Sequence, residues 1–277
     1  MNTEAMLLMA RFGLAGLTLL AASGVAAAGS AQVVVPAGAF QMGCSSGDAE
    51  CEKDEEPSGG TRVEVPAFSI DINEVTVAEY RRCIDAGACR RPDDHARNQY
   101  CNLDAPGRDK HPMNCVDWSD AVDYCEWVGR RLPTEAEWEK AARAGSTTAY
   151  PWGSEVSCEQ AILDDGITRG SKGDEMDGCG EDRTWPIGSR AANALGLFDM
   201  NGNAGEWTAN WYAGDALSAL YAKGDLNGPP QGRQKVVRGG SWDENRPNLR
   251  SSFRNVKPPV SGNAIYGSLG FRCAADL

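Results

Sequence analysis

The chain has 277 residues and a formal net charge of −12 at pH 7, with 27 basic and 39 acidic side chains. Such an acidic protein repels nucleic-acid phosphates and anionic membrane surfaces, so we expect neither as a partner. Thirty-two glycines, eight tryptophans and few long periodic runs indicate one loop-rich domain with short strands.

The first 28 residues have the pattern of a signal peptide. Arg11 supplies a basic n-region, residues 12–22 an apolar h-region, and the alanines at 26–28 a small-residue cleavage site. Either Met1 or Met9 is the start. The apolar run is too short to span a bilayer, so we expect no membrane insertion. This pattern predicts a periplasmic or secreted protein, with residues 29–277 forming a single domain.

All ten cysteines follow this leader, and an even number in an exported protein predicts disulfides. Spacing alone does not fix the connectivity. Four short-range pairs are suggested by the loops that they bracket: Cys44 with Cys51, Cys83 with Cys89, Cys101 with Cys115, and Cys158 with Cys179. Cys125 and Cys273 remain.

In chain order, residues 33–43 predict a hairpin of two strands around Pro36-Ala37-Gly38. Residues 48–60 form an acidic loop, interpreted as a solvated charge run rather than a cation site. Residues 63–71 alternate as a half-buried strand should. The two histidines, His95 and His111, are expected to lie on the surface without binding a metal.

Three helices are predicted. Thr76 and Glu79 form a capping box that opens a helix ending near Asp85, and residues 120–128 show helical spacing of apolar side chains. A second capping box, Thr134 to Glu137, opens a helix through Arg143. The acids at 135–139 tempt an acid–base interpretation, but capping explains them without chemistry.

Near the C-terminus, Val236-Val237 predicts a short buried strand and Gly239-Gly240 a tight turn into a polar surface loop. Arg250 and Arg254 are four residues apart and would share one face of a helical turn. Two interpretations stay open for them: an ion-paired or solvated rim, and a surface that faces a substrate.

Several stretches together resemble the formylglycine-generating enzyme (sulfatase-modifying factor) family, over about residues 33–276. The most specific is the run from Arg131 to Arg143, RLPTEAEWEKAAR. The others are YPWG at 150–153, the segment 193–208, the segment 236–255 and the ending GFRCAAD at 270–276. Residues 112–118 also resemble a strand of the family, so the resemblance implies a strand there. The resemblance implies an α+β fold, a C-type-lectin-like variant that is loop-rich, with short helices and a small antiparallel sheet. It also implies a disulfide between Cys125 and Cys273.

The chain departs from this family's pattern in its catalytic loop. The enzymes carry two copper-binding cysteines after Gly-Gly-Ser, whereas residues 242–249 here contain none. Asp243, Glu244 and Asn245 are hard oxygen donors that do not replace thiolates on Cu(I), so we expect no copper. Gly205 also replaces a tryptophan that helps to line the enzymes' active site. The family's first calcium site has no clear match.

The resemblance does carry over a second, structural calcium site. Its positions correspond to Asp199, Gly202, Ala204 and Glu206, which offer two carboxylates and two backbone carbonyls. The same spacing also suits an ordinary turn with solvated carboxylates. Calcium is therefore an expectation that rests on the resemblance.

Three functions remain open. The first is an exported binding or accessory domain for an unknown protein or small-molecule ligand, whose pocket would be formed by Ser241, Trp242, Asp243, Glu244, Arg250 and Arg254. The second is a periplasmic oxidoreductase with other chemistry, because the family includes siderophore-maturation members that lack the copper cysteines. The third, a true formylglycine-generating oxidase, is disfavoured by the missing cysteines.

Overall fold

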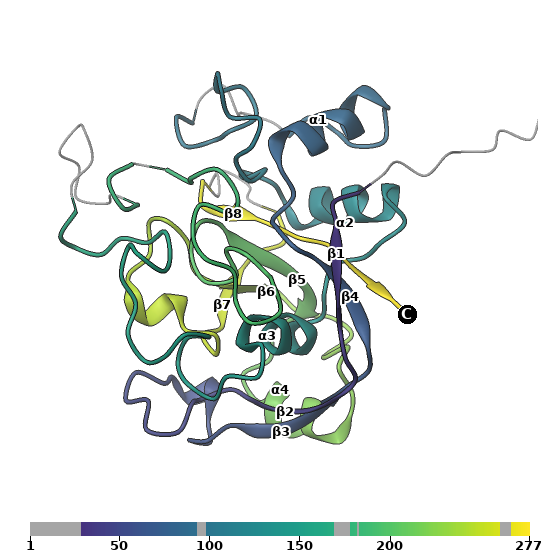
Figure 1. The fold of residues 1–277 in the computed structure, drawn as a ribbon. Helices are drawn as coiled ribbons and strands as arrows, with labels where there is room; N and C mark the ends of the chain where they lie inside the picture. Colours follow the sequence, from purple (N-terminus) through teal and green to yellow (C-terminus); the bar gives the residue numbers. More distant parts are fainter. Residues whose placement is uncertain (1–28, 93–97, 169–177, 182, 261–266) are drawn as a thin grey trace, which may run out of the picture.

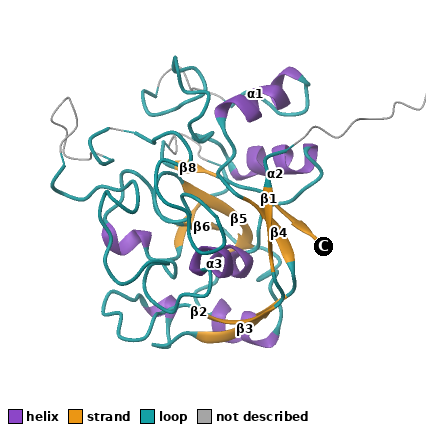
Figure 2. Ribbon diagram, viewed as in Figure 1, coloured by secondary structure: helices purple, strands orange, loops and turns teal. Residues whose placement is uncertain are grey.

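The computed structural model describes residues 29–92, 98–168, 178–181, 183–260 and 267–277. The expected signal peptide and His95 lie outside these residues. The described ranges contain no helix that is both long and apolar enough to cross a membrane. Short helices and strands are joined by long loops (Figures 1 and 2), which confirms the predicted loop-rich α+β fold.

Three small sheets form the described fold instead of one. The first joins β1 (Gln32–Val35), β4 (Phe68–Asp71) and β9 (Ala274–Asp276), and the second joins β2 (Gly38–Met42) and β3 (Thr61–Val65). The third has the order β7 (Asn255–Lys257), β6 (Lys235–Arg238), β5 (Gly205–Trp211), β8 (Leu269–Gly270). Its β5–β8 pair is parallel, and the other pairs are antiparallel.

The predicted hairpin within residues 33–43 is wrong. β1 pairs with β4, and β2 pairs with β3, in one continuous register in which Val35 lies opposite Phe68 and Gly38 opposite Val65. Pro36-Ala37 therefore faces Pro66-Ala67. A proline cannot donate a hydrogen bond to a neighbouring strand. The strand pairing is therefore interrupted opposite the same residues in both segments, and the two segments bend together. The predicted strand at 63–71 is interrupted for the same reason.

The helices α1 (Val77–Asp85) and α3 (Glu135–Arg143) begin at the predicted capping boxes of Thr76 and Thr134. The helix α2 (Trp118–Trp127) begins two residues earlier than expected, because Asp117 and Asp120 form a third capping box. Residues 112–118 are consequently not a strand. The remaining helical segments are η1 (Lys53–Glu55), α4 (Ala216–Ala219), η3 (Tyr221–Lys223) and η4 (Arg246–Leu249).

All five predicted disulfides are present. The four local pairs are Cys44–Cys51, Cys83–Cys89, Cys101–Cys115 and Cys158–Cys179. Cys125 of α2 pairs with Cys273 at the start of β9, across 148 residues. Both sulfurs lie in a core with Tyr80, Tyr124 and Phe271, so this bridge ties the C-terminus to the two helices α1 and α2.

Candidate functional site

The loop after β6 is fixed by close backbone contacts. Gly239 and Gly240 have φ values of 93° and 66°, and a Cβ on Gly240 would lie 2.7 Å from the carbonyl oxygen of Asn248. Only glycine fits both requirements, which explains the pair. The Trp242 N–H then donates to the Asn203 carbonyl at 3.0 Å and holds the loop against the segment before β5.

Glu244 is the unusual side chain of this loop. Its Oε1 accepts a hydrogen bond from Asn255 Nδ2 at 2.8 Å, whereas its buried Oε2 accepts none within the described residues. Burial, and then the nearby charge of Asp243, raise the pKa of Glu244 to about 7. A buried carboxyl with a free oxygen and a pKa near neutrality can hold or release a proton, so this position has the properties of a functional site.

Trp242 provides the complementary group. Its side chain is 2% exposed, and its ring packs against Tyr100 with centroids 5.2 Å apart. The indole Nε1 is buried and donates to no described residue. Buried polar atoms are nearly always satisfied. One unsatisfied donor and one unsatisfied acceptor, two residues apart, therefore indicate that a ligand or ordered water completes this loop.

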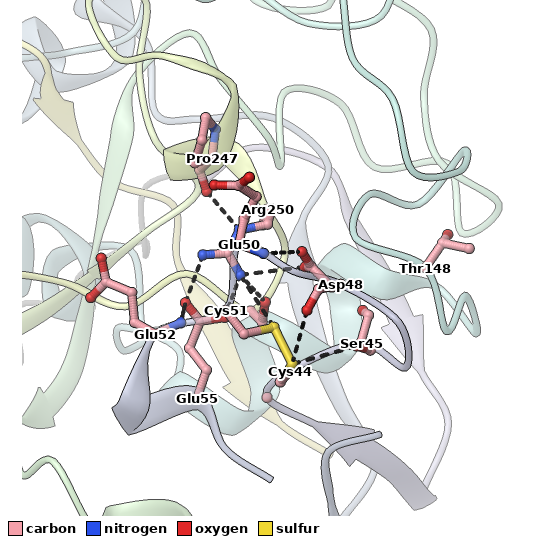
Figure 3. Close-up of a disulfide and its surroundings, with 12 residues drawn as sticks. Cys44, Ser45, Asp48, Glu50, Cys51, Glu52, Glu55, Thr148, Pro247 and Arg250 are labelled. Atoms are coloured by element: carbon pink, nitrogen blue, oxygen red, sulfur yellow. Dashed lines mark hydrogen bonds and ion pairs between the residues drawn. A yellow bond between two sulfur atoms is a disulfide. The ribbon is translucent and has the colours of Figure 1, made fainter. Parts of the chain in front are cut away.

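The predicted pocket does not include its two arginines. Arg250 is 2% exposed and forms a two-pronged ion pair with Glu55 beside the Cys44–Cys51 disulfide, as Figure 3 shows. It also donates to the Pro247 carbonyl at 2.9 Å. Arg250 follows η4, so no helical turn brings it onto one face with Arg254. Of the two interpretations given for Arg250, the ion pair is correct. The pair lies inside the protein, however, and not at the rim of a pocket.

Arg254 is equally internal, because both of its prongs bind Glu135 at the start of α3. Arg238 and the hydroxyl of Tyr221 complete the shell of Glu135. Burial alone would raise the pKa of Glu135, but these two guanidiniums hold it below its usual value. Glu135 is thus the centre of a buried network of ion pairs, and neither a capping acid nor an acid–base catalyst. No sequence motif indicated this network.

The other residues of the predicted pocket differ in how deeply they are buried. Ser241 is buried and its Oγ donates to Asp243 Oδ1 at 2.5 Å. Asp243 and Glu244 are half-buried as whole residues, although the Oε2 atom of Glu244 is itself buried. Tyr100 and Asn255, which complete the surroundings of Trp242 and Glu244, were not predicted. Tyr100 is distant in sequence, and Asn255 ends the 236–255 segment without belonging to a motif.

The expected calcium positions lie together in a buried loop. Both oxygens of Glu206 accept from Arg272, at 2.7–2.8 Å, and Oε2 also accepts from Trp138 Nε1. Asp199 accepts from the Gly188 N–H at 2.7 Å. Within the described ranges no three His, Cys, Asp or Glu side chains converge as metal ligands, so a calcium ion here would depend on the carbonyls of Gly202 and Ala204.

A third carboxyl group, that of Glu74, lies beside the expected calcium positions. Glu74 is buried beside them, binding Asn203 Nδ2 and the Ala204 N–H at 2.8 and 2.9 Å. Burial, followed by the charges of Asp199 and Glu206, raises the pKa of Glu74 well above its usual value. Glu74, Asp199 and Glu206 are thus neighbouring carboxyl groups, and the charges that offset theirs are those of Arg272 and, at Asp199, Arg190.

Gly205 leaves no room for the tryptophan of the enzymes that the sequence resembles. A Cβ at this position would lie 3.0 Å from Leu269 Cδ2 and 3.2 Å from Val237 Cγ1. A side chain at position 205 would therefore require Leu269 and Val237 to move.

A family model, "Sulfatase-modifying factor enzyme 1-like domain", matches residues 20–277. The chain belongs to this family. It is 34% identical over 260 residues to the serine/threonine-protein kinase Pkn1 of Chlamydia trachomatis, covering 88% of this chain and 38% of the kinase. It is 40% identical over 178 residues to the formylglycine-generating enzyme of Thermomonospora curvata, covering 61% of this chain and 57% of that enzyme.

Among solved structures, this sulfatase-modifying-factor domain is similar to PvdO from Pseudomonas aeruginosa, with a TM-score of 0.70 and 29% identity over 89% of this chain and 94% of PvdO. The chain spans little more than a third of the kinase that it matches. In contrast to the cysteine pair of the family's enzymes, all ten cysteines here are in disulfides. The residues of the 242–249 loop therefore do not fit copper.

Proposed function

We propose that this protein is an exported sulfatase-modifying-factor domain that does not generate formylglycine and that binds a ligand at Trp242 and Glu244. The proposal rests on two buried, unsatisfied polar atoms, Nε1 of Trp242 and Oε2 of Glu244. Both lie in the loop where the family's enzymes bind copper. Five disulfides support export, because such bridges persist in oxidising compartments.

The ligand that fits this pair carries a hydrogen-bond acceptor for the indole and a donor for the carboxylate. Asn255 fixes one oxygen of Glu244 and leaves the other for the ligand. The packing of Trp242 against Tyr100 restricts the indole to one orientation. A small polar molecule or a peptide group meets these requirements better than an apolar ligand, since an apolar ligand would leave both atoms unsatisfied.

A second function is favoured by the pKa of Glu244, which lies at about 7. A carboxyl that titrates near neutral pH is suited to general acid–base work. In an oxidoreductase of this family without copper, Glu244 would hold or accept the proton that leaves the substrate. The similarity to PvdO, at 29% identity over most of both chains, supports keeping this alternative.

The first experiment tests the loss of formylglycine chemistry. Purified protein from residue 29 onward is incubated with Cu(I), oxygen and a sulfatase peptide of the Cys-x-Pro-x-Arg type. Because the 242–249 loop has no thiolate, we expect no aldehyde by mass spectrometry, whereas a true formylglycine-generating enzyme in parallel forms it. Copper-dependent aldehyde formation by this protein contradicts the proposal.

The second experiment tests the ligand site. A panel of polar metabolites and short peptides is screened by the shift in melting temperature of the wild type. Compounds bound at this site should lose their effect in Glu244→Gln and Trp242→Phe, which keep the volume and ring packing. They should keep it in Glu126→Gln, a change at an exposed carboxylate. Compounds that bind both site variants as well as the wild type place the ligand elsewhere.

A further inference from the structure

Six arginines are buried in the described part of the chain, and one differs from the others. Five form ion pairs with glutamates at 3.0 Å or less: Arg143, Arg238, Arg250, Arg254 and Arg272. Arg108 is 7% exposed, yet no described carboxylate forms an ion pair with it. Its Nη1 donates to the neutral amide oxygen of Asn102 at 2.9 Å.

An unpaired buried guanidinium is energetically unfavourable. Taking a charge out of water costs several kcal/mol unless a counter-charge replaces the lost hydration. Burial, and then the positive charge of Arg183, lower the pKa of Arg108 to about 10. The surroundings of Arg108 thus disfavour its charge, whereas glutamates at the other five arginines stabilise theirs. Among the described residues, the carboxylate of Glu181 offsets this only in part and forms no ion pair with Arg108.

Arg183 is the second cation of this cluster. Its Nε is buried and makes no hydrogen bond to a described residue, and the Oε2 of Glu181 lies 4.0 Å from it. The following residue, Thr184, accepts a hydrogen bond from Asn102 Nδ2 at 2.9 Å. Asn102 therefore contacts Arg108 with its oxygen and the Arg183 segment with its nitrogen, which holds the two arginines near one another.

His111 lies near both arginines without adding a charge. Its Nδ1 is 3.2 Å from Thr184 Oγ1. Burial, together with the charges of Arg108 and Arg183, lowers the pKa of His111 to about 4, so the ring is neutral at pH 7. The expected surface histidine is in fact partly buried. A neutral imidazole beside two guanidiniums adds hydrogen-bonding capacity for an anion and avoids a third buried cation.

We propose that Arg108 and Arg183 form a binding site for an oxyanion, a carboxylate or a tetrahedral sulfate or phosphate group, on a small-molecule ligand. Guanidinium groups bind such oxygens through paired N–H donors. Glu181, whose Oε2 lies 4.0 Å from Arg183 Nε, is the described carboxylate that acts on both guanidiniums, so two arginines share one partner in a chain whose net charge is −12. The inference does not depend on Glu244 and stands if the proposed function fails.

The two sites are connected through one aromatic side chain. Tyr100 packs against Trp242, and its carbonyl accepts from Asn114 Nδ2 at 2.8 Å. Asn114 Oδ1 in turn accepts from the Asn102 N–H at 2.8 Å. Asn102 is the residue that contacts Arg108. A single ligand with an anionic group and a neutral polar group therefore has both recognition elements on neighbouring, hydrogen-bonded segments.

The test is titration of wild-type protein with sodium acetate, sodium sulfate and methyl phosphate at fixed ionic strength, followed by calorimetry and melting temperature. We expect saturable binding of at least one anion. Arg108→Gln and Arg183→Gln should each weaken it about tenfold, since each removes a charge-assisted hydrogen bond. Glu181→Gln should strengthen it by removing the nearby carboxylate. Arg81→Gln, at an exposed pair with Asp109, is the matched control.

The choice of anion separates the sources of the ligand group. Binding of acetate identifies a carboxylate, and binding of sulfate or methyl phosphate identifies a tetrahedral group. Circular dichroism verifies that Arg108→Gln is folded, and Arg183→Gln serves independently, because Arg183 is partly exposed. The proposal is overturned if none of the three anions binds saturably, or if binding is equally tight in both arginine variants.

Discussion

Arg254 and Glu135 face each other inside the protein through two hydrogen bonds, from Nε to Oε1 at 2.7 Å and from Nη2 to Oε2 at 3.0 Å. The two residues are 119 positions apart in the sequence. The pair joins the first turn of α3, at the centre of Figure 1, to the segment that follows the candidate site. Arg254 therefore positions this segment and is not available to a ligand.

Removing either partner should destabilise the fold strongly. Glu135→Gln or Arg254→Met leaves the other charge buried without its partner, which typically costs about 3–5 kcal/mol in the free energy of unfolding. Urea denaturation measures the loss. Arg62→Met, at the exposed pair with Glu64, should change stability little. A small effect at Glu135 would mean that Arg238 and Tyr221 rearrange to take over, contrary to the geometry.

The Cys125–Cys273 bridge should contribute more than any of the local disulfides. It closes a loop of 148 residues, and in the chain-entropy model such a loop is worth about 4–5 kcal/mol, against about 2–3 kcal/mol for short loops. We compare Cys125→Ala/Cys273→Ala with Cys83→Ala/Cys89→Ala in urea. Equal losses in the two double variants would show that packing around the sulfurs, rather than loop length, sets the difference.

The sequence predicted those parts of the fold that are determined locally. The capping boxes at Thr76 and Thr134 satisfy helix-end N–H groups within four residues, so α1 and α3 could be placed precisely. The hairpin at 33–43 failed because its turn signal was correct but its partner strand was distant. Pro36 bends the chain, yet only the long-range register with residues 61–71 shows what it pairs with.

The site was predicted by position but not by role. The resemblance located the loop at 241–250. The side chains expected to face a ligand, such as that of Arg250, are buried in the structure, which changes their role. Arg250 and Arg254 were candidates because their spacing of four suggested a shared face, whereas their partners Glu55 and Glu135 lie 195 and 119 residues away. A sequence motif cannot show that a carboxylate such as that of Glu244 is desolvated, because desolvation depends on the surrounding fold.

Glu244 should make the protein less stable as the pH rises. Its pKa is raised to about 7 from a usual value of 4.5, so the folded state binds this proton more tightly than the unfolded state does. The stability gained from the proton is present below pH 4.5 and is lost as the pH rises to 7, by up to about 3 kcal/mol.

The pH dependence of unfolding, measured by urea denaturation from pH 4 to pH 8, tests this. Glu244→Gln cannot ionise and should be more stable than the wild type at pH 8 but similar at pH 4. Glu126→Gln should follow the wild type throughout. A wild type whose unfolding free energy falls no further than that of Glu244→Gln over this range would show that the carboxyl is solvated.

Calcium is the last prediction, and it rests on the charge around Glu206. Glu74 and Glu206 are buried and Asp199 beside them is half-buried, with Arg272 as the cation that contacts Glu206. Burial raises the pKa of Asp199 to about 6, and the charge of Glu206 contributes. A calcium ion held by Asp199, Glu206 and the carbonyls of Gly202 and Ala204 would relieve this repulsion and stabilise the loop before Trp207.

Chelator-treated protein should therefore melt at a higher temperature when calcium is added, by an amount equivalent to about 2.7 kcal/mol at one hundred times the dissociation constant. Asp199→Asn keeps the side-chain volume, and asparagine tolerates the φ of 55° at this position. It should lose the rise, as should Glu206→Gln. Magnesium, which requires a stricter octahedral geometry, should give a smaller rise. If Arg272 alone neutralises the cluster, calcium will not change the melting temperature of the wild type. An equal rise in wild type and both variants would place the ion at another position.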